Sequence, residues 1–390
     1  MRITGKIRDI GTNAVLSVLL QPLWAVPFFL YNTYATLYMI KLGVREGEIG
    51  VVNSVSFLVK AAVSLFAGYI INKLGRKKSL LIFDMVSWVI PYIILSFATS
   101  YEHFLIAGII NATSVVNTIA WQCCLVEDVR QEHRVYVFNV LEVMMILSGV
   151  FTPITGWLIG KHTLIPVIRG MYFFAFLCMA VSIIVRAFML KETSVGMNVR
   201  EYGGAKLPEI YQSFWKAFAY IIHNRMLIIL FIINILIMFN LVINNIYYVP
   251  YLTMHLGLSE ITVSFYPFVT SIAAIIMLVL VLSRFKLSQF IFSGVLLLYI
   301  AGTCFLLLVP AETSGQSIIR SALLFSNVIC WAVAKSLVNI ILQTKISNVI
   351  SDSLRDSFQP FSQIHLPIYF DCLFSLFSSV CFLRQDGKYC

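Results

Sequence analysis

The sequence contains little charge. Only 12% of its 390 residues are Asp, Glu, Lys or Arg, whereas 59% are hydrophobic. Soluble globular domains carry about 25% charged residues, so this composition excludes an ordinary water-soluble fold, which would lack the ionic groups to cover its surface. The charged residues that are present lie in short stretches between long apolar runs. This distribution is typical of a chain that crosses a membrane several times.

The apolar runs lack the alternation of polar and apolar residues that the strands of a membrane β-barrel require. They are continuously apolar over the roughly 20 residues that a helix needs to cross the hydrocarbon core. In lipid the backbone must satisfy its own hydrogen bonds, and a helix does so within one segment. The sequence therefore predicts an all-α polytopic membrane protein.

The sequence also lacks the motifs of several chemical sites, namely a P-loop, a nucleophile elbow, a zinc-binding spacing and a glycine fingerprint for a cofactor. Its eight cysteines form no C-x-x-C pair, and the adjacent Cys123 and Cys124 have poor geometry for a metal. We expect no enzymatic activity, no metal and no cofactor. The net charge of +10 comes from basic residues at the ends of apolar runs, which argues against a nucleic acid partner.

We expect eleven membrane spans, with no cleavable signal peptide before the first one. When the N-terminus is placed in the cytoplasm, the cytoplasmic segments hold most of the Lys and Arg residues that lie outside the spans, as the positive-inside rule requires. The expected spans cover residues 14–41, 49–71, 79–99, 103–126, 135–160, 165–190, 226–252, 261–283, 287–309, 317–342 and 361–383.

The longest polar segment, residues 191–225, divides the chain into an N-terminal six-helix bundle (1–190) and a C-terminal bundle of about five helices (226–390). Within this linker, apolar residues recur at helical spacing from Leu207 to Ile221. The spacing predicts an amphipathic helix on the cytoplasmic surface, and the alternative is an extension of the seventh span.

The two halves of the chain look related. Tyr34 and the segment Leu42–Glu46 close the first span, while Tyr248 and the segment Leu256–Glu260 close the seventh span with the same spacing. Parallel repeats joined by a cytoplasmic linker are typical of transporters that bind their substrate between the halves. The repeat therefore predicts a substrate site where the two halves meet.

The segment from Gly68 to Lys78, between the second and third spans, carries the most specific motif. Gly68 allows a close approach of helices, and Gly75 allows a tight turn. Arg76 and Lys77 hold that turn at the cytoplasmic surface. Anchoring by positive charge alone would explain the basic residues but not both glycines.

This segment resembles the signature G-x-x-x-D-[RK]-x-G-R-[RK] of the major facilitator superfamily, with Asn72 in place of the acidic residue. The resemblance implies two six-helix bundles of that family's type, which carry a small solute by alternating access. It also implies a cytoplasmic latch between the bundles, to which Asn72 supplies no charge. The matching residues are Gly68, Lys73, Gly75, Arg76 and Lys77.

The loop after the fourth span contains Glu127, Asp128 and Arg134. The family often places an acid and an arginine here, in contact with the basic turn, so the resemblance adds these residues to the cytoplasmic gate. A solvated charged loop is the alternative.

The fifth span is similar to a degraded form of a motif of the family's antiporters, in which Pro153 kinks the helix between Gly149 and Gly156. Thr152 and Trp157 stand where glycines are expected, and the arginine of the fourth span is missing. The resemblance favours efflux slightly over uptake.

Ionisable residues within spans are costly and are candidates for function. Asp84 lies close enough to the cytoplasmic end of its span that we expect a structural role, although it stays a candidate for charge relay. By the family pattern Lys335 faces the substrate, while Lys60 and Glu142 pair or relay charge between the halves. A buried ion pair that fixes packing is the alternative.

Amide side chains on the first, fourth, seventh and tenth spans are further candidates, because the resemblance assigns these spans to the wall of the substrate cavity. Hydrogen bonding between helices is the alternative. The candidates are Asn32, Asn111, Asn117, Asn240, Asn244, Asn245 and Asn339.

The sequence thus predicts a monomeric secondary transporter of the cytoplasmic membrane, which moves a small organic solute at the expense of a proton or ion gradient. One alternative is a non-transporting membrane sensor or assembly protein on the same scaffold. Another is an inactive truncated carrier. Family members usually have twelve spans, and the chain changes in character near Phe358, so we expect the twelfth span to be lost.

Overall fold

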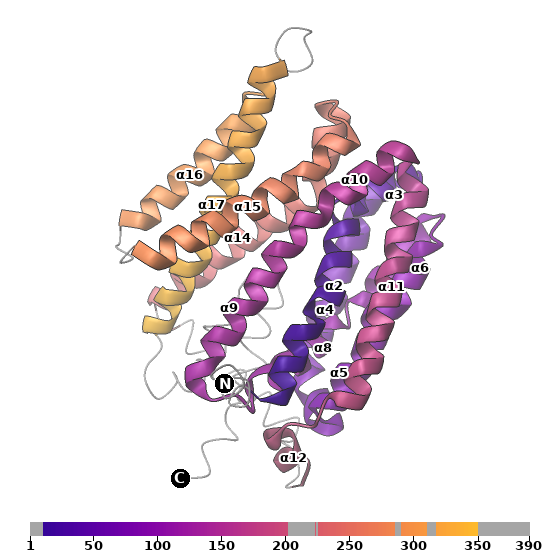
Figure 1. Ribbon diagram of the computed structural model, residues 1–390, viewed down its shortest axis with the longest axis vertical. Coiled ribbons are helices and arrows are strands. Elements are labelled where there is room, and N and C mark those ends of the chain that lie inside the picture. Colours follow the sequence, from indigo (N-terminus) through magenta and orange to yellow (C-terminus); the bar gives the residue numbers. More distant parts are fainter. Residues whose placement is uncertain (1–10, 202–222, 224, 285–289, 310–316, 350–390) are drawn as a thin grey trace, which may run out of the picture.

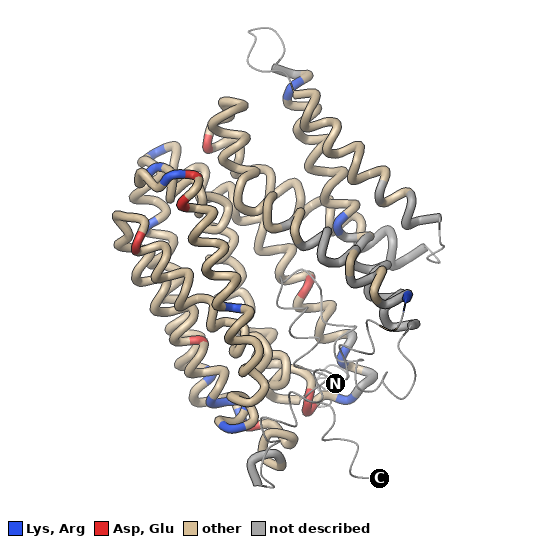
Figure 2. The backbone as a smooth tube through the Cα atoms, turned by 180° about the vertical axis from the view of Figure 1, so that it is seen from behind, with Lys and Arg blue, Asp and Glu red and all other residues tan. Residues whose placement is uncertain are grey.

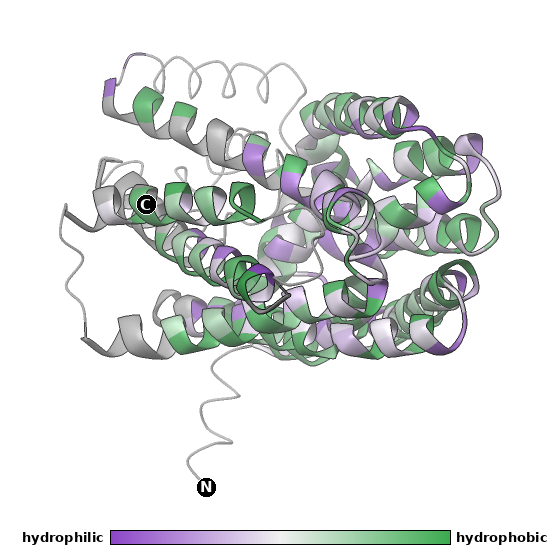
Figure 3. Cartoon of the chain, turned by 90° about the horizontal axis from the view of Figure 1, so that it is seen from above, coloured by the Kyte–Doolittle hydropathy of each residue, from purple (hydrophilic) through white to green (hydrophobic). Residues whose placement is uncertain are grey.

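Nearly every residue that the structure describes is helical. The computed structural model describes residues 11–201, 223, 225–284, 290–309 and 317–349, and it contains no strand within these ranges. The predicted all-α fold is confirmed. Figure 3 shows how largely hydrophobic these helices are, as expected for segments that satisfy their backbone hydrogen bonds internally in lipid.

The helices from α2 to α11 coincide with the first six predicted spans, several of which consist of shorter helices joined in line, and α12 lies in the predicted linker. The elements are α2 (Thr12–Asn32), α3 (Ala35–Lys41), α4 (Glu46–Leu74), α5 (Arg76–Asp84), η1 (Met85–Val89), α6 (Ile90–Ser96), α7 (Tyr101–Asn111), α8 (Ser114–Val126), α9 (Gln131–Ser148), η2 (Gly149–Phe151), α10 (Thr152–Lys161), α11 (Leu164–Met189) and α12 (Ser194–Glu201).

The second half supplies four further helical spans, which coincide with the seventh to tenth predicted ones. The predicted eleventh span, the amphipathic helix around Leu207–Ile221 and the change of character near Phe358 lie outside the described residues. The elements are α14 (Arg225–Pro250), η3 (Tyr251–His255), α15 (Glu260–Arg284), α16 (Phe290–Leu307) and α17 (Ser317–Val349).

Seven helical stretches within the described ranges are long and apolar enough to cross a membrane, judged by length and composition. Six lie in the first half, and the seventh is Glu260–Met277. Most acidic and basic residues gather near the ends of the helices and few lie along their middles (Figure 2). This charge distribution matches a multi-pass membrane protein.

The break within the fifth span follows from Pro153, which has no N–H to donate to the carbonyl four residues earlier. That carbonyl belongs to Gly149, and the Thr152 hydroxyl donates to it at 2.9 Å. The chain forms the short 3₁₀ turn η2 at this point. Thr152, one of the departures from the antiporter motif, therefore compensates for the proline beside it.

A proline also shapes the third span. Pro91 cannot donate to the carbonyl of Ser87, and the Asn111 side chain of α7 donates to that carbonyl at 2.7 Å. The widened turn η1 precedes the proline. Asn111 therefore forms a hydrogen bond between two helices, to a carbonyl that Pro91 leaves without its usual helical partner. This contact is the alternative to a place in the cavity wall.

The two halves form two groups of helices that meet along one seam (Figure 1). The helix α10 and the turn η2 pack along α15, and α3 packs against α14. We call the end of the helices that carries Lys73–Lys78 the basic end, and the opposite end, which carries Lys41 and Glu260, the far end. Because α10 finishes and α15 begins at the far end, the seam runs toward that end.

Candidate functional site

Arg76, at the basic end, is fully buried at the start of α5. Its Nε lies 3.2 Å from Glu127 Oε1, and its Nη1 donates to Asn72 Oδ1 at 3.2 Å. A buried charge requires such partners because it has lost its hydration. Asn72 thus keeps a contact with Arg76 as a neutral acceptor. Burial raises the pKa of the Glu127 carboxyl, and the charge of Arg76 opposes that rise.

Glu192, which the sequence analysis did not single out, caps the start of α5. Its Oε1 accepts the backbone N–H of Arg76 at 2.9 Å, and its Oε2 accepts that of Lys77 at 3.3 Å. The first N–H groups of a helix have no partner within the helix and attract negative charge. Gly75 has φ +89°, and a Cβ there would lie 2.5 Å from Glu192 Oε2. The motif's second glycine therefore allows both the turn and the cap.

The residues that follow Glu192 continue these contacts. The Thr193 hydroxyl donates to Glu127 Oε2, while Ser194 donates to Asp128 Oδ1 through its N–H at 3.1 Å and its hydroxyl at 2.7 Å. Residues Glu192–Ser194 thus connect the C-terminal end of α11 to the loop after α8 and to the start of α5. The sequence feature that could have identified Glu192 is its position, since it is an acidic residue directly after the sixth span in a mostly basic segment.

The other residues of the predicted gate lie around this cluster. Gly68 is buried within α4, and the Lys73 ammonium lies 5.8 Å from the centre of the Tyr69 ring. Arg134, in the first turn of α9, donates from Nε to the carbonyl of Val129 at 3.1 Å, in the loop before that helix.

Asp84 forms an ion pair inside the first half. Its Oδ2 lies 2.5 Å from Arg186 Nη1, and Asn117 donates to its Oδ1. Asp84 is 2% exposed and Arg186 is 5% exposed. The three side chains come from α5, α11 and α8, so they join three helices. This geometry favours the structural alternative for Asp84 and Asn117, and their partner Arg186 is not among the candidates that the sequence singled out.

Glu142 and Lys335 bring opposite charges from the two halves toward each other. Glu142 lies on α9 and Lys335 on α17, and the two groups are within electrostatic range of each other. Both side chains are half-buried, as is that of Lys60 on α4. An acid of the first half and a cation of the second therefore face each other electrostatically, and the pairing of Glu142 with Lys60 stays a prediction.

The predicted cavity amides of α14 lie one turn apart. Asn244 donates from Nδ2 to Asn240 Oδ1 at 2.8 Å, and Asn240 and Asn245 are exposed. Asn32 is half-buried at the end of α2. The side chain of Asn339 on α17 lies outside the described part of the structure. The α14 amides are therefore available on a helix that packs against α17, which carries Lys335.

Two contacts between the halves converge on Glu260 at the far end. The Tyr34 hydroxyl donates to the Glu260 backbone carbonyl at 2.6 Å, and Lys41 Nζ lies 3.3 Å from Glu260 Oε1. The repeat counterpart of Tyr34 behaves differently, because Tyr248 donates to Asn327 Oδ1 within its own half at 2.8 Å. The contact between the halves at this end is therefore not symmetric.

The seam below Glu260 is formed by small residues. A Cβ added to Gly156 would collide with Ser264 Oγ, and one added to Gly149 would collide with Ser271 Oγ. The glycines of the fifth span therefore let α10 and η2 lie directly against α15. Close packing of this kind joins transmembrane helices without a hydrophobic driving force.

Comparison with known proteins decides the family. A sequence model described as Major Facilitator Superfamily matches residues 23–357. The chain belongs to the Major Facilitator Superfamily. It is therefore a membrane transport protein by family. A search of curated proteins by sequence finds no match.

Solved structures of superfamily transporters share the fold. A mutant of the nucleoside transporter NupG superposes with a TM-score of 0.68 at 15% sequence identity, over 94% of this chain and 90% of that chain. The inward-open form of the xylose transporter XylE from E. coli gives 0.60 at 11% identity, over 96% and 94%. The peptide transporter POT in complex with alafosfalin gives 0.62 at 11%, over 96% and 88%. Identities this low show the fold alone.

Proposed function

We propose that this superfamily member is a secondary active transporter, which moves a small organic solute across the cytoplasmic membrane by alternating access. The observation that carries the proposal is the convergence of Tyr34 and Lys41 on Glu260. One hydrogen bond and one half-exposed ion pair join the halves there, and both can break without unfolding either half. Contacts of this kind suit two groups of helices that rock against each other.

The interior charges support coupling to a proton or ion gradient. Glu142 and Lys335 come from different halves and lie within electrostatic range, so their separation changes whenever the halves move. Ionisable residues at membrane depth are costly unless they serve such a function. In this proposal Lys335 belongs to the substrate site, together with the amides Asn240 and Asn244 of the neighbouring helix.

The basic end faces the cytoplasm in this proposal, in keeping with the excess of positive charge on the segments at that end. The far end then faces outward, and the contacts at Glu260 close it. We infer efflux rather than uptake from the degraded antiporter motif around Pro153. The carrier works as a monomer, since each half finds its partner within the same chain.

The test is flux of labelled metabolites into proteoliposomes with and without a pH gradient. We expect gradient-dependent flux, with at least a tenfold loss in Lys335→Ala. The matched control is Lys161→Ala, which removes an exposed lysine that lies over the Trp157 ring at the far end and should leave flux unchanged. Equal flux in both variants would remove Lys335 from the site. Folded protein that moves no solute in the panel would favour the non-transporting alternative, which the neutral Asn72 already favours slightly.

A further inference from the structure

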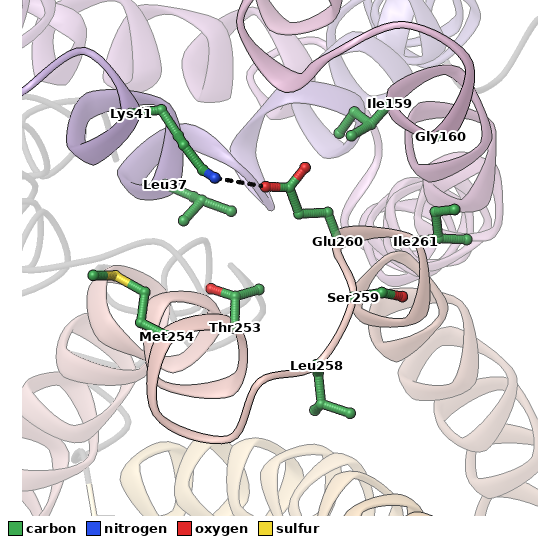
Figure 4. A pocket seen from close by; sticks show the side chains of 10 residues that line it. All are labelled: Leu37, Lys41, Ile159, Gly160, Thr253, Met254, Leu258, Ser259, Glu260 and Ile261. Carbon is green, nitrogen blue, oxygen red and sulfur yellow. Dashed lines mark ion pairs between the residues drawn. The ribbon is translucent and has the colours of Figure 1, made fainter. Parts of the chain in front are cut away.

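The structure contains a pocket of about 420 Å³ at the far end, between the two halves (Figure 4). Leu37 and Ile159 line it from the first half, and Met254, Leu258 and Ile261 line it from the second. An apolar pocket with few polar groups is the usual form of a site for a small molecule. Because its walls belong to different halves, a separation of the halves at the far end would widen the pocket.

The charged groups that line the pocket are Lys41 and Glu260, and they differ in mobility. Lys41 has a long stem and a side chain that is 52% exposed, whereas that of Glu260 is 25% exposed. Glu260 is also fixed by position, since it begins α15 and its backbone carbonyl accepts the Tyr34 hydroxyl. The negative charge is therefore the anchored one, and the positive charge can move aside.

The Glu260 carboxylate has acceptor capacity to spare. A carboxylate offers about four lone-pair sites on two oxygens, and Lys41 approaches one oxygen at 3.3 Å. The hydroxyls of the pocket are already engaged, because Thr253 donates to the carbonyl of Val249 at 3.0 Å and Ser259 pairs with Thr262 at 2.8 Å. For a ligand that donates a hydrogen bond, the ionised carboxylate of Glu260 is thus the strongest acceptor among the side chains that line the pocket.

We propose that this pocket is a binding site for small organic ammonium compounds. The ammonium group donates to the Glu260 carboxylate, and a compact apolar body lies against Leu37, Ile159 and Ile261. Hydrogen bonds between ionised groups are the strongest that such a pocket offers. A bound amine touches both halves, so it favours the closed far end and slows flux. The effect on flux rests on the proposed function, whereas binding does not.

The experiment compares 1-aminoadamantane with its neutral isostere 1-adamantanol on the full-length protein in nanodiscs. Binding is measured by equilibrium dialysis and by the shift in melting temperature. We expect the amine to bind at least about tenfold tighter than the alcohol at pH 7, since hydrogen bonds to charged groups contribute more. Glu260→Gln should remove that difference. Glu46→Gln, the exposed repeat counterpart outside the pocket, should leave it unchanged.

Equal affinity for the amine and the alcohol would overturn the proposal, and so would unchanged amine binding in Glu260→Gln. Met254→Trp provides a second test that leaves both charges in place, because it fills the pocket from an exposed position. It should abolish amine binding, and retained binding would place the amine elsewhere. Amine binding without flux of any metabolite would contradict the proposed function and leave this site standing.

Discussion

At the scale of single residues, the basic end shows what a motif in the sequence can and cannot reveal. Gly75 was recognisable because a tight turn favours a glycine, and Arg76 was recognisable because it lies in the same motif, although its complete burial was not predicted. Their partner Glu192 was not, because it follows a different span and only the fold brings it within 2.9 Å of the Arg76 N–H. A tight turn can be predicted from the residues that form it. A partner that lies far away in the sequence can be identified only from the fold.

Three glycines form a graded test of the turn. Gly75 combines φ +89° with contact to Glu192, Gly43 has φ +86° with no atom near its Cβ position, and Gly170 lies in a helix with open space around it. We expect Gly75→Ala to lower the free energy of unfolding most, Gly43→Ala by about 1–3 kcal/mol through strain, and Gly170→Ala not at all. Melting temperatures in nanodiscs rank the three. A Gly75→Ala effect no larger than that of Gly43→Ala would mean that the contact with Glu192 is unimportant.

The cap itself is tested by changing Glu192. Glu192→Ala removes the acceptor for two backbone N–H groups and should cost about 0.5–2 kcal/mol, as the loss of a helix cap does. Glu192→Gln keeps an acceptor without the charge and should cost less. Chemical denaturation of the full-length protein measures both changes. Equal stability of wild type and Glu192→Ala would show that water replaces the carboxylate without loss.

At the scale of elements, the sequence predicted where helices lie better than how they are interrupted. Ten predicted spans coincide with described helices because long apolar runs in lipid have few alternatives. The bonds that mend the proline breaks were not predictable from Pro91 and Pro153 alone. The carbonyl of Gly149 accepts a hydrogen bond from the neighbouring Thr152, and the carbonyl of Ser87 accepts one from Asn111 of another helix. The second arrangement depends on packing that only the folded bundle shows.

The seam between α10 and α15 is tested by enlarging a glycine. Gly156→Leu places a side chain where Ser264 Oγ lies, so the two helices must move apart. We expect the far end to open more often, which increases labelling from outside by a membrane-impermeant maleimide at a cysteine introduced at Asn244. Gly170→Leu, on a helix surface with open space, should leave labelling unchanged. Equal labelling in both variants would show that the seam tolerates the bulk.

At the scale of the whole molecule, the repeat predicted two related halves, and the family match confirms the fold that follows from it. A repeat predicts symmetric contacts, however, and the far end departs from that symmetry. Tyr34 reaches across to Glu260, whereas Tyr248 turns to Asn327 in its own half. Both repeats contain the same Tyr and Glu. Only the structure shows which of these residues form the contact between the halves.

We propose that the halves separate at the far end and that the contacts of Glu260 hold them together there. The most direct measurement is the distance between spin labels at Lys161 and Leu308, which are exposed on α10 and just beyond α16. Labels attached through an azide-bearing amino acid leave the eight cysteines intact. Glu260→Gln should add a longer distance to the distribution of the wild type, and Glu46→Gln should not. A single distribution shared by all three proteins would mean that Glu260 does not hold the halves together.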